Sequence, residues 1–140
     1  MREFLLDTNV ISELTKDAPA LRVIEFLSAD QHEFWISSVV IHELEYGLEL
    51  LPLGRRRSDL QELLWGFVAE HRGRIVPLDQ TGAEWAARFR ARAHRVGRVL
   101  ELGDALIAGT AKSRRLAVAT RNVVDFSELE LEVVNPWKPT

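Results

Sequence analysis

The chain has 140 residues, with 21 acidic and 18 basic side chains and a formal net charge of −3. This length predicts one domain, residues 1–140, because roughly 100–200 residues per domain is usual. Without cysteine, a disulfide scaffold, a thiolate zinc site and a cysteine nucleophile are excluded. Without a signal peptide or a run near roughly 20 apolar residues, we expect a soluble, cytoplasmic protein with no membrane partner.

Short apolar runs alternate with longer stretches of helical periodicity, which predicts an α/β domain with a mostly parallel sheet. We expect strands at residues 4–6, 34–36, 75–77, 116–120 and 133–134. We expect helices beginning near Val10 and covering residues 19–29, 38–51, 57–70, 80–94 and 103–115. Capping residues support these starts: Thr8 and Asn9 for the first helix, Pro19 in the first turn of the second, and Ser37 or Ser38 for the third.

Two acidic residues follow predicted strands at their carboxyl ends. Asp7 comes directly after the strand 4–6, and Asp125 lies in the loop after the strand 116–120. Ligands of open parallel sheets bind just outside these strand ends, which makes both carboxylates candidates for a site. The simpler interpretations are that Asp7 caps the following helix and that Asp125 belongs to a turn of Asn and Asp. Either Asn122 or Asp125 could supply the site oxygen.

Two further acids lie on predicted helices. Glu43 is the one acid of the helix 38–51 that falls inside its apolar arc, where a carboxylate is costly unless it is paired or binds a metal. Asp104 opens a helix that is apolar nearly all round and rich in small residues, so it projects from a buried element. The alternatives are a Glu43 side chain that reaches water and an Asp104 that only complements the helix dipole.

One metal site explains all four acidic placements together. Three carboxylates and a fourth oxygen donor, with no cysteine, suit a hard cation such as Mg²⁺ or Mn²⁺. The four histidines show no ligand spacing such as H-E-x-x-H, so a dedicated zinc site is not expected. The sequence therefore predicts a carboxylate-lined Mg²⁺ or Mn²⁺ site at the carboxyl edge of the sheet.

Four stretches of the chain occur together in the order and spacing of a known family: LLDTNVISE at 5–13, ISSVVIHEL at 36–44, DALIAGTA at 104–111 and ATRNVVDF at 119–126. With the ending Asn135-Pro136-Trp137, these motifs make the chain resemble the PIN-domain ribonucleases. More specifically, it resembles the VapC-like toxins of toxin–antitoxin pairs, in their FitB-like branch. The resemblance spans the whole chain, and four ordered motifs are far more specific than a single Asp-Thr-Asn.

The resemblance implies a three-layer α/β/α sandwich around a mostly parallel sheet of about five strands. It also implies hydrolysis of single-stranded or loop RNA with one or two Mg²⁺ or Mn²⁺ ions. By residue, Asp7, Glu43 and Asp104 match the catalytic, metal-binding acids of the family. Which carboxylate acts as the general base is left open.

A fourth site position and three supporting positions also match the family. Asp125 matches a fourth acid found in many members, although some members place it where Asn122 stands here. Thr8 and Asn9 match residues that orient the first acid, and Thr120 matches a polar residue behind the site.

The resemblance further implies protein partners. A cognate antitoxin of the VapB or FitA type would cover the site with its tail, and an Arg or a Lys of that tail would pair with the acids. A homodimer and a larger toxin–antitoxin assembly are also implied, for which the helices between residues 19 and 71 offer apolar faces.

Arginine dominates the basic residues, 15 of 18, and forms two clusters with the chemistry to bind RNA phosphates. The alternative is that these arginines are solvated or pair with nearby acids. The net charge of −3 by itself disfavours a nucleic-acid partner, but local potential at a metal site governs such binding. The clusters are Arg55, Arg56 and Arg57, and Arg88, Arg90, Arg92, Arg95 and Arg98.

Other families that cluster acids at strand ends fit less well. A haloacid-dehalogenase-like phosphatase needs a second Asp where Asn9 stands, and a receiver domain needs a Lys directly after the fourth strand, which is missing. A dinucleotide-binding domain needs a glycine-rich turn after a strand, which is also missing. The non-enzymatic alternative is a catalytically silent PIN-like binding module.

Overall fold

The computed structural model describes residues 1–139, so Thr140, the last residue of the predicted domain, lies outside the described part. The strands are β1 (Arg2–Leu6), β2 (His32–Ser37), β3 (Ile75–Val76), β4 (Ala117–Ala119) and β5 (Val133–Val134). The helices are α1 (Thr8–Ser12), α2 (Leu21–Ser28), α3 (Ser38–Glu49), α4 (Arg55–Glu70), α5 (Gln80–Arg95), α6 (Leu102–Arg114) and α7 (Val123–Phe126). Two 3₁₀ turns cover Glu13–Thr15 and Arg72–Arg74.

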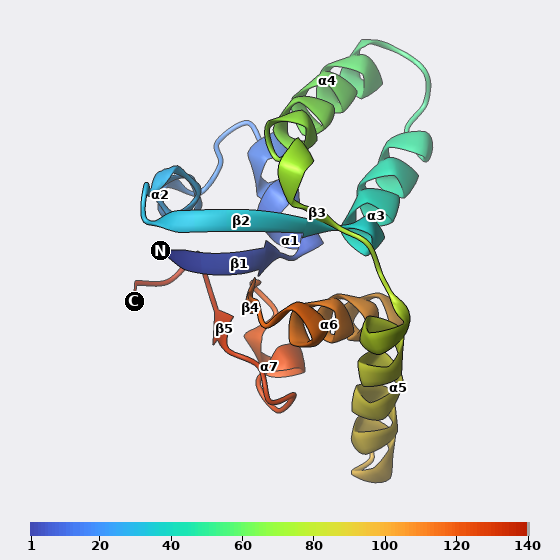
Figure 1. Ribbon diagram of the computed structural model, residues 1–140. Coiled ribbons are helices and arrows are strands. Elements are labelled where there is room, and N and C mark those ends of the chain that lie inside the picture. The colour runs from blue at the N-terminus through green and yellow to red at the C-terminus, as the bar shows by residue number, and fades with distance from the viewer. Residues whose placement is uncertain (140) are drawn as a thin grey trace.

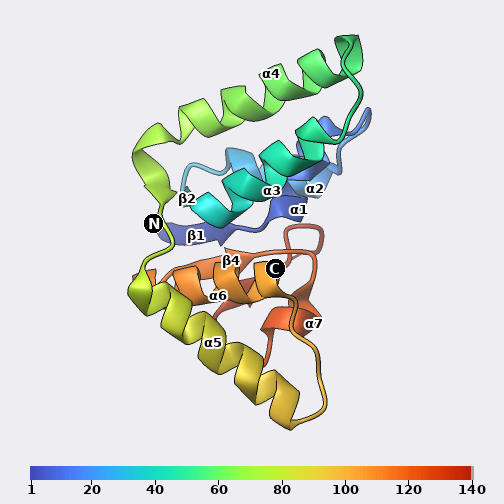
Figure 2. The same ribbon diagram turned by 90° about the vertical axis from the view of Figure 1, so that its right-hand side faces the viewer.

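The strands form one parallel sheet in the order β3-β2-β1-β4-β5. The connections from β1 to β3 step in one direction across the sheet, and those from β3 to β5 step in the other. Because such crossovers are right-handed, α1–α4 cover one face and α5–α7 cover the other. Figures 1 and 2 show α3 and α4 in one half of the molecule and α5–α7 in the other half. This arrangement confirms the predicted three-layer α/β/α fold.

The core is densest around the central strand. Phe4, Leu5 and Leu6 of β1 are completely buried, as expected for a parallel strand that is covered on both faces. Small residues on α6 allow α5 and α6 to approach closely. A methyl group built on Gly109 would lie only 2.2 Å from the carbonyl oxygen of Gly82, so the two helix backbones are in direct contact there. This packing fixes α6, whose first turn carries Asp104, against α5.

Several predicted boundaries were wrong. The first helix begins at Thr8 with Asp7 as its cap, so Thr8 and Asn9 lie within the helix. The second helix begins at Leu21 after Ala20, so Pro19 precedes it. The turn expected around Asp125 is the short helix α7, which ends with Phe126 fully buried. Burial of that ring favours the helical turn over the isolated Asn–Asp turn that local propensity indicates.

Among residues 1–139, no helix is both long and apolar enough to cross a membrane.

Candidate active site

Asp7 lies at the carboxyl end of β1 and is only 3% exposed. Its Oδ1 accepts a hydrogen bond from the Thr8 backbone N–H at 2.8 Å, which is the capping role weighed from the sequence. Its Oδ2 accepts from the Thr120 hydroxyl at 2.7 Å and from the Asn9 side-chain amide at 3.3 Å. Asp7 therefore caps α1 and is also held rigidly at the sheet edge by Thr120 from the neighbouring strand end.

Glu43 projects from α3 toward the first turns of α1 and α6. The Thr8 hydroxyl donates a hydrogen bond to Oε1 of Glu43 at 2.5 Å. The other oxygen, Oε2, lies against Gly103, where a methyl group would be only 2.6 Å away. Thr8 thus orients two acids, Asp7 through its backbone N–H and Glu43 through its hydroxyl. The family resemblance implied only that Thr8 orients Asp7.

Asp104, in the first turn of α6, lies near Asp7 and Glu43. Burial, followed by the nearby negative charges of Asp7, Asp125, Glu43 and Glu101, raises the pKa of Asp104 to about 6. Burial also raises the pKa of Asp7, against the hydrogen bonds from Thr120 and Thr8 that lower it. The charges of Glu43 and Asp125 raise it further.

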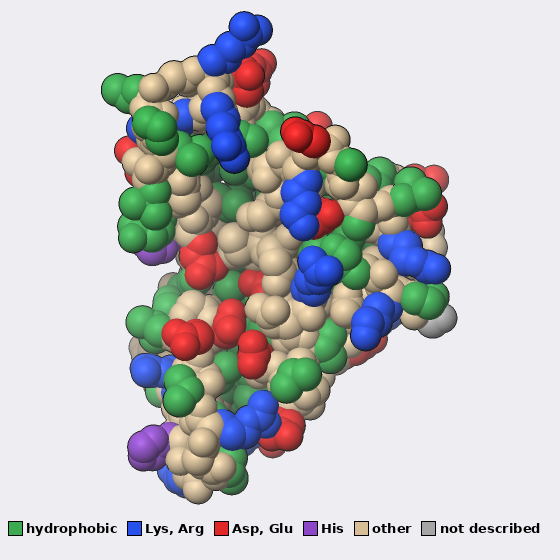
Figure 3. All heavy atoms as spheres, turned by 180° about the vertical axis from the view of Figure 1, so that it is seen from behind, with side chains coloured by type: hydrophobic (Ala, Val, Ile, Leu, Met, Phe, Trp, Pro, Cys, Tyr) green, Lys and Arg blue, Asp and Glu red, His purple; other side chains and the backbone are tan. Residues whose placement is uncertain are grey.

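The structure thus brings together the four acids singled out in the sequence, from the end of β1 and from α3, α6 and α7. Figure 3 shows acidic side chains gathered around a notch between the half that carries α3 and α4 and the half that carries α5 and α6. Asp7 is buried, Glu43 and Asp104 are half-buried, and Asp125 is exposed at the rim.

The fourth oxygen donor was left open between Asp125 and Asn122. The negative charge of Asp125 raises the pKa of both Asp7 and Asp104, so Asp125 lies near these two acids. Asn122 contributes its backbone N–H, which donates to the Thr120 hydroxyl oxygen at 3.0 Å. This geometry favours Asp125, and its role as a ligand stays a prediction.

The chemistry of this cluster fits a hard cation. Its donors are carboxylate oxygens alone, and none of the four acids forms an ion pair with a Lys, Arg or His among residues 1–139. Among these described residues, no group of three or more Asp, Glu, His or Cys side chains is already arranged to hold a metal ion. Like charges repel, and a bound cation would offset the repulsion between these carboxylates.

The predicted RNA-binding arginines fall into two groups. The first group has partners within the chain, as the alternative interpretation expected. These contacts are Arg57 with Glu49 at 2.8 Å, Arg92 with Glu130 at 2.9 Å, Arg98 with Glu128, and Arg88 over the Trp85 ring, 5.0 Å from its centroid.

The second group is exposed and consists of Arg55, Arg56, Arg90 and Arg95. Arg55 approaches Asp59 only at 4.0 Å, and the other three form no ion pair within residues 1–139. Arg56 also lines a groove between α3 and α4 that reaches Glu43. The exposed group therefore retains the predicted capacity to bind phosphate.

Sequence reasoning missed Gly103. Its lack of a side chain leaves the space that the Glu43 carboxylate occupies beside Asp104. A glycine in the first turn of a helix carries no local signal of such a role, because the contact joins residues 60 positions apart that only the folded chain brings together.

A parallel α/β/α sandwich with an acid cluster at its carboxyl edge is the arrangement predicted for a PIN domain, and the PIN-domain family profile matches residues 4–130. The chain belongs to the PIN-domain family. It is 37% identical to the VapC ribonuclease Y4jK of Sinorhizobium fredii, over 96% of this chain and 98% of that protein. It is also 37% identical to toxin FitB of Neisseria gonorrhoeae, over 95% and 97%.

Comparison with solved structures gives the same family. The crystal structure of FitAcB from Neisseria gonorrhoeae superposes with a TM-score of 0.87 at 37% identity, covering 96% of this chain and 98% of that chain. The predicted resemblance to VapC-like and FitB-like toxins is therefore confirmed.

Proposed function

We propose that this protein is a metal-dependent endoribonuclease and the toxin of a toxin–antitoxin pair. The observation that carries the proposal is that four carboxylates, from four separate elements, lie near one another without a cationic partner within residues 1–139. The name of the Sinorhizobium relative, a VapC ribonuclease, supports RNA as the substrate class.

Asp7, Glu43, Asp104 and Asp125 would hold one or two Mg²⁺ or Mn²⁺ ions. When bound, such ions activate water as a nucleophile and stabilise the charge that develops on the phosphate and on the leaving oxygen. The chain itself holds the acids in place. Thr120 fixes Asp7 through its hydroxyl, and Thr8 fixes Glu43, so the two carboxylates approach from fixed directions.

The proposed reaction is hydrolysis of a phosphodiester bond. Water adds to the phosphorus, the bond to the 3′ oxygen breaks, and the products carry a 5′-phosphate and a 3′-hydroxyl. A carboxylate that contacts the attacking water would accept its proton. The exposed Arg56, Arg90 and Arg95 are the side chains available to bind flanking phosphates.

The test is cleavage of RNA by the purified protein with EDTA, Mg²⁺ or Mn²⁺. We expect cleavage only with metal, and a loss of at least about a hundredfold in Asp7→Asn and Asp104→Asn. Asp59→Asn is the matched control, because Asp59 is an exposed acid on α4 that is not one of the four clustered acids. Full cleavage in EDTA, or in the Asp104→Asn variant, would refute the proposed chemistry. RNA binding without cleavage under any metal would instead support the silent binding module.

The partner side of the proposal is an antitoxin of the VapB or FitA type. The structural neighbours include a member of the VapBC family of toxin–antitoxin systems from Mycobacterium tuberculosis, which supports it. A homodimer within a larger assembly belongs to the same proposal. Copurification of the protein with the product of an adjacent small gene, at a fixed ratio and with loss of RNA cleavage, is the expected result. Sequencing of RNA 5′ ends after brief expression would identify the target.

A further inference from the structure

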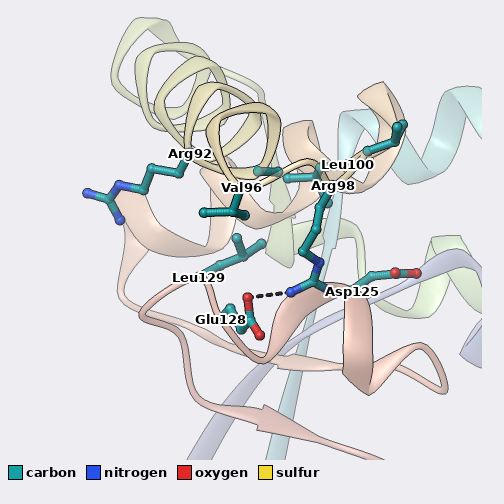
Figure 4. Close-up of a pocket in the computed structure, with 9 residues that line it drawn as sticks. Arg92, Val96, Arg98, Leu100, Asp125, Glu128 and Leu129 are labelled. Atoms are coloured by element: carbon teal, nitrogen blue, oxygen red, sulfur yellow. Dashed lines mark ion pairs between the residues drawn. The ribbon is translucent and has the colours of Figure 1, made fainter.

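A cavity of about 220 Å³ has one of the four site acids, Asp125, among its lining residues (Figure 4). Asp125 lies on its rim, and the same carboxylate acts electrostatically on Asp7 and Asp104. The other walls come from the end of α5, from the loop that joins α5 to α6, and from the segment after α7. A polymer that runs from the acid cluster past Asp125 brings a neighbouring group to the mouth of this cavity.

The lining combines apolar walls with one ion pair. Val96, Leu100 and Leu129 supply the apolar surface, and Leu100 and Leu129 are only 8% and 6% exposed, so they are fixed in the core. The Arg98 guanidinium pairs with the Glu128 carboxylate across the cavity, as Figure 4 shows. Arg98 also donates to the backbone oxygen of Val124 at 3.3 Å, which anchors it to α7.

This lining disfavours a free anion and suits a neutral group that has an apolar surface and polar edges. A free phosphate would meet the carboxylate of Glu128 and lie close to that of Asp125. Both cations of the lining, Arg98 and Arg92, are already paired, with Glu128 and Glu130 respectively. The volume is equivalent to about seven water molecules at about 30 Å³ each, which is room for a ring system rather than for a single ion. The paired Arg98 and Glu128 are a donor and an acceptor, side by side, for the edge of such a ring.

We propose that this cavity binds a nucleobase of the RNA substrate, next to the bond that is cleaved, and that Arg98 and Glu128 determine which base is accepted. The inference rests on the proposed ribonuclease function and adds a specificity site to it. Unstacked RNA bases are recognised in this manner, by contact of their faces with apolar or guanidinium groups and by hydrogen bonds to their edges. Carboxylates accept from base amino groups, and arginine donates to base carbonyl and ring nitrogen atoms.

The test uses short RNA oligonucleotides in which only the base beside the cleaved bond is varied. For the unaltered protein with Mg²⁺ or Mn²⁺, we expect kcat/KM to differ by about tenfold or more between the best and the worst base. In Arg98→Ala and in Glu128→Gln, that ratio falls to within about threefold, chiefly because the preferred base loses its advantage. Matched controls are Arg22→Ala and Glu25→Gln, exposed charges on α2, which keep the full ratio.

A second measurement does not depend on cleavage. In EDTA, nucleoside 5′-monophosphates are titrated while the methyl signals of Leu100 and Leu129 are followed by NMR. We expect base-dependent shifts of these signals that weaken in Arg98→Ala, whereas ribose 5-phosphate causes none. A melting temperature close to that of the unaltered protein confirms that the Arg98→Ala variant is folded.

The outcomes separate the two proposals. Absence of cleavage with every metal refutes the ribonuclease function. The NMR titration still tests whether the cavity binds a nucleobase. An unchanged base preference in both variants, or methyl signals that do not respond to any base, overturns the nucleobase site. Loss of affinity for a protein partner in Arg98→Ala, with base preference unchanged, would assign the cavity to a protein side chain and likewise overturn it.

Discussion

Replacing Gly103 by alanine tests the geometry of the acid cluster most directly. The added methyl group would lie 2.6 Å from Oε2 of Glu43, whereas ordinary van der Waals contacts begin near 3.4 Å. The carboxylate must therefore move by about 0.8 Å or rotate away, since it is the far end of a flexible side chain whereas the helix backbone is fixed. Metal ligands tolerate deviations of only about 0.2 Å, so this displacement is large for a binding site.

The expected result is a loss of metal affinity without a loss of folding. Disturbing the groups that orient a metal ligand typically lowers affinity by about 10–100-fold, and we expect Gly103→Ala to fall in that range for Mn²⁺. Stability should change little, because alanine is favoured over glycine in helices by about 0.5–1 kcal/mol, which offsets a weakened Thr8–Glu43 hydrogen bond.

The assay is calorimetric titration with Mn²⁺, with RNA cleavage and thermal unfolding measured on the same samples. Gly66→Ala is the matched control, because a methyl group at this α4 position would meet no atom within 4 Å. Adding Glu43→Asp to Gly103→Ala shortens the acid by one methylene group and should restore part of the affinity. Unchanged Mn²⁺ affinity in Gly103→Ala, or an equal loss in Gly66→Ala, would refute the reasoning.

Two further predictions concern Asp104 and Asp7. The pKa of Asp104 is raised from 3.8 to about 6, so the folded state holds this proton more tightly than the unfolded state does. The stability of the metal-free protein therefore falls as pH rises between these values. In EDTA, Asp104→Asn should raise the melting temperature at pH 7.5 and change it little near pH 3.5, and equal effects at both would contradict this. Thr120→Val removes the hydroxyl that donates to Asp7 within the core, and urea unfolding should show a loss of about 1–3 kcal/mol that Thr120→Ser largely avoids.

Much of the fold could be predicted from local patterns. The run Phe4–Leu6 is apolar because a central parallel strand is covered on both faces, and its burial follows from that pattern alone. Apolar patterns likewise predicted the positions of Asp7, at the end of a strand, and of Asp104, at the start of a buried helix. The short helix α7 was missed because its Asn and Asp favour a turn locally, while its stability comes from burial of Phe126.

The contacts that position the site acids depend on the tertiary structure alone. Strand β4 pairs with β1, which places the Thr120 hydroxyl against Asp7 across 113 positions of sequence. The approach of α3 to α6 sets Glu43 against Gly103, and no local propensity encodes that contact.

The arginines likewise combine features that the sequence shows with features that only the folded structure determines. Their number and clustering are evident in the sequence, but a side chain such as Arg98 acquires its role from the partner that folding brings to it, Glu128, at the edge of a cavity. Periodicity reports the burial of single elements, because it depends on neighbours a few positions away. The pairings that shape a site depend on strand order and helix packing, which join positions far apart in the chain.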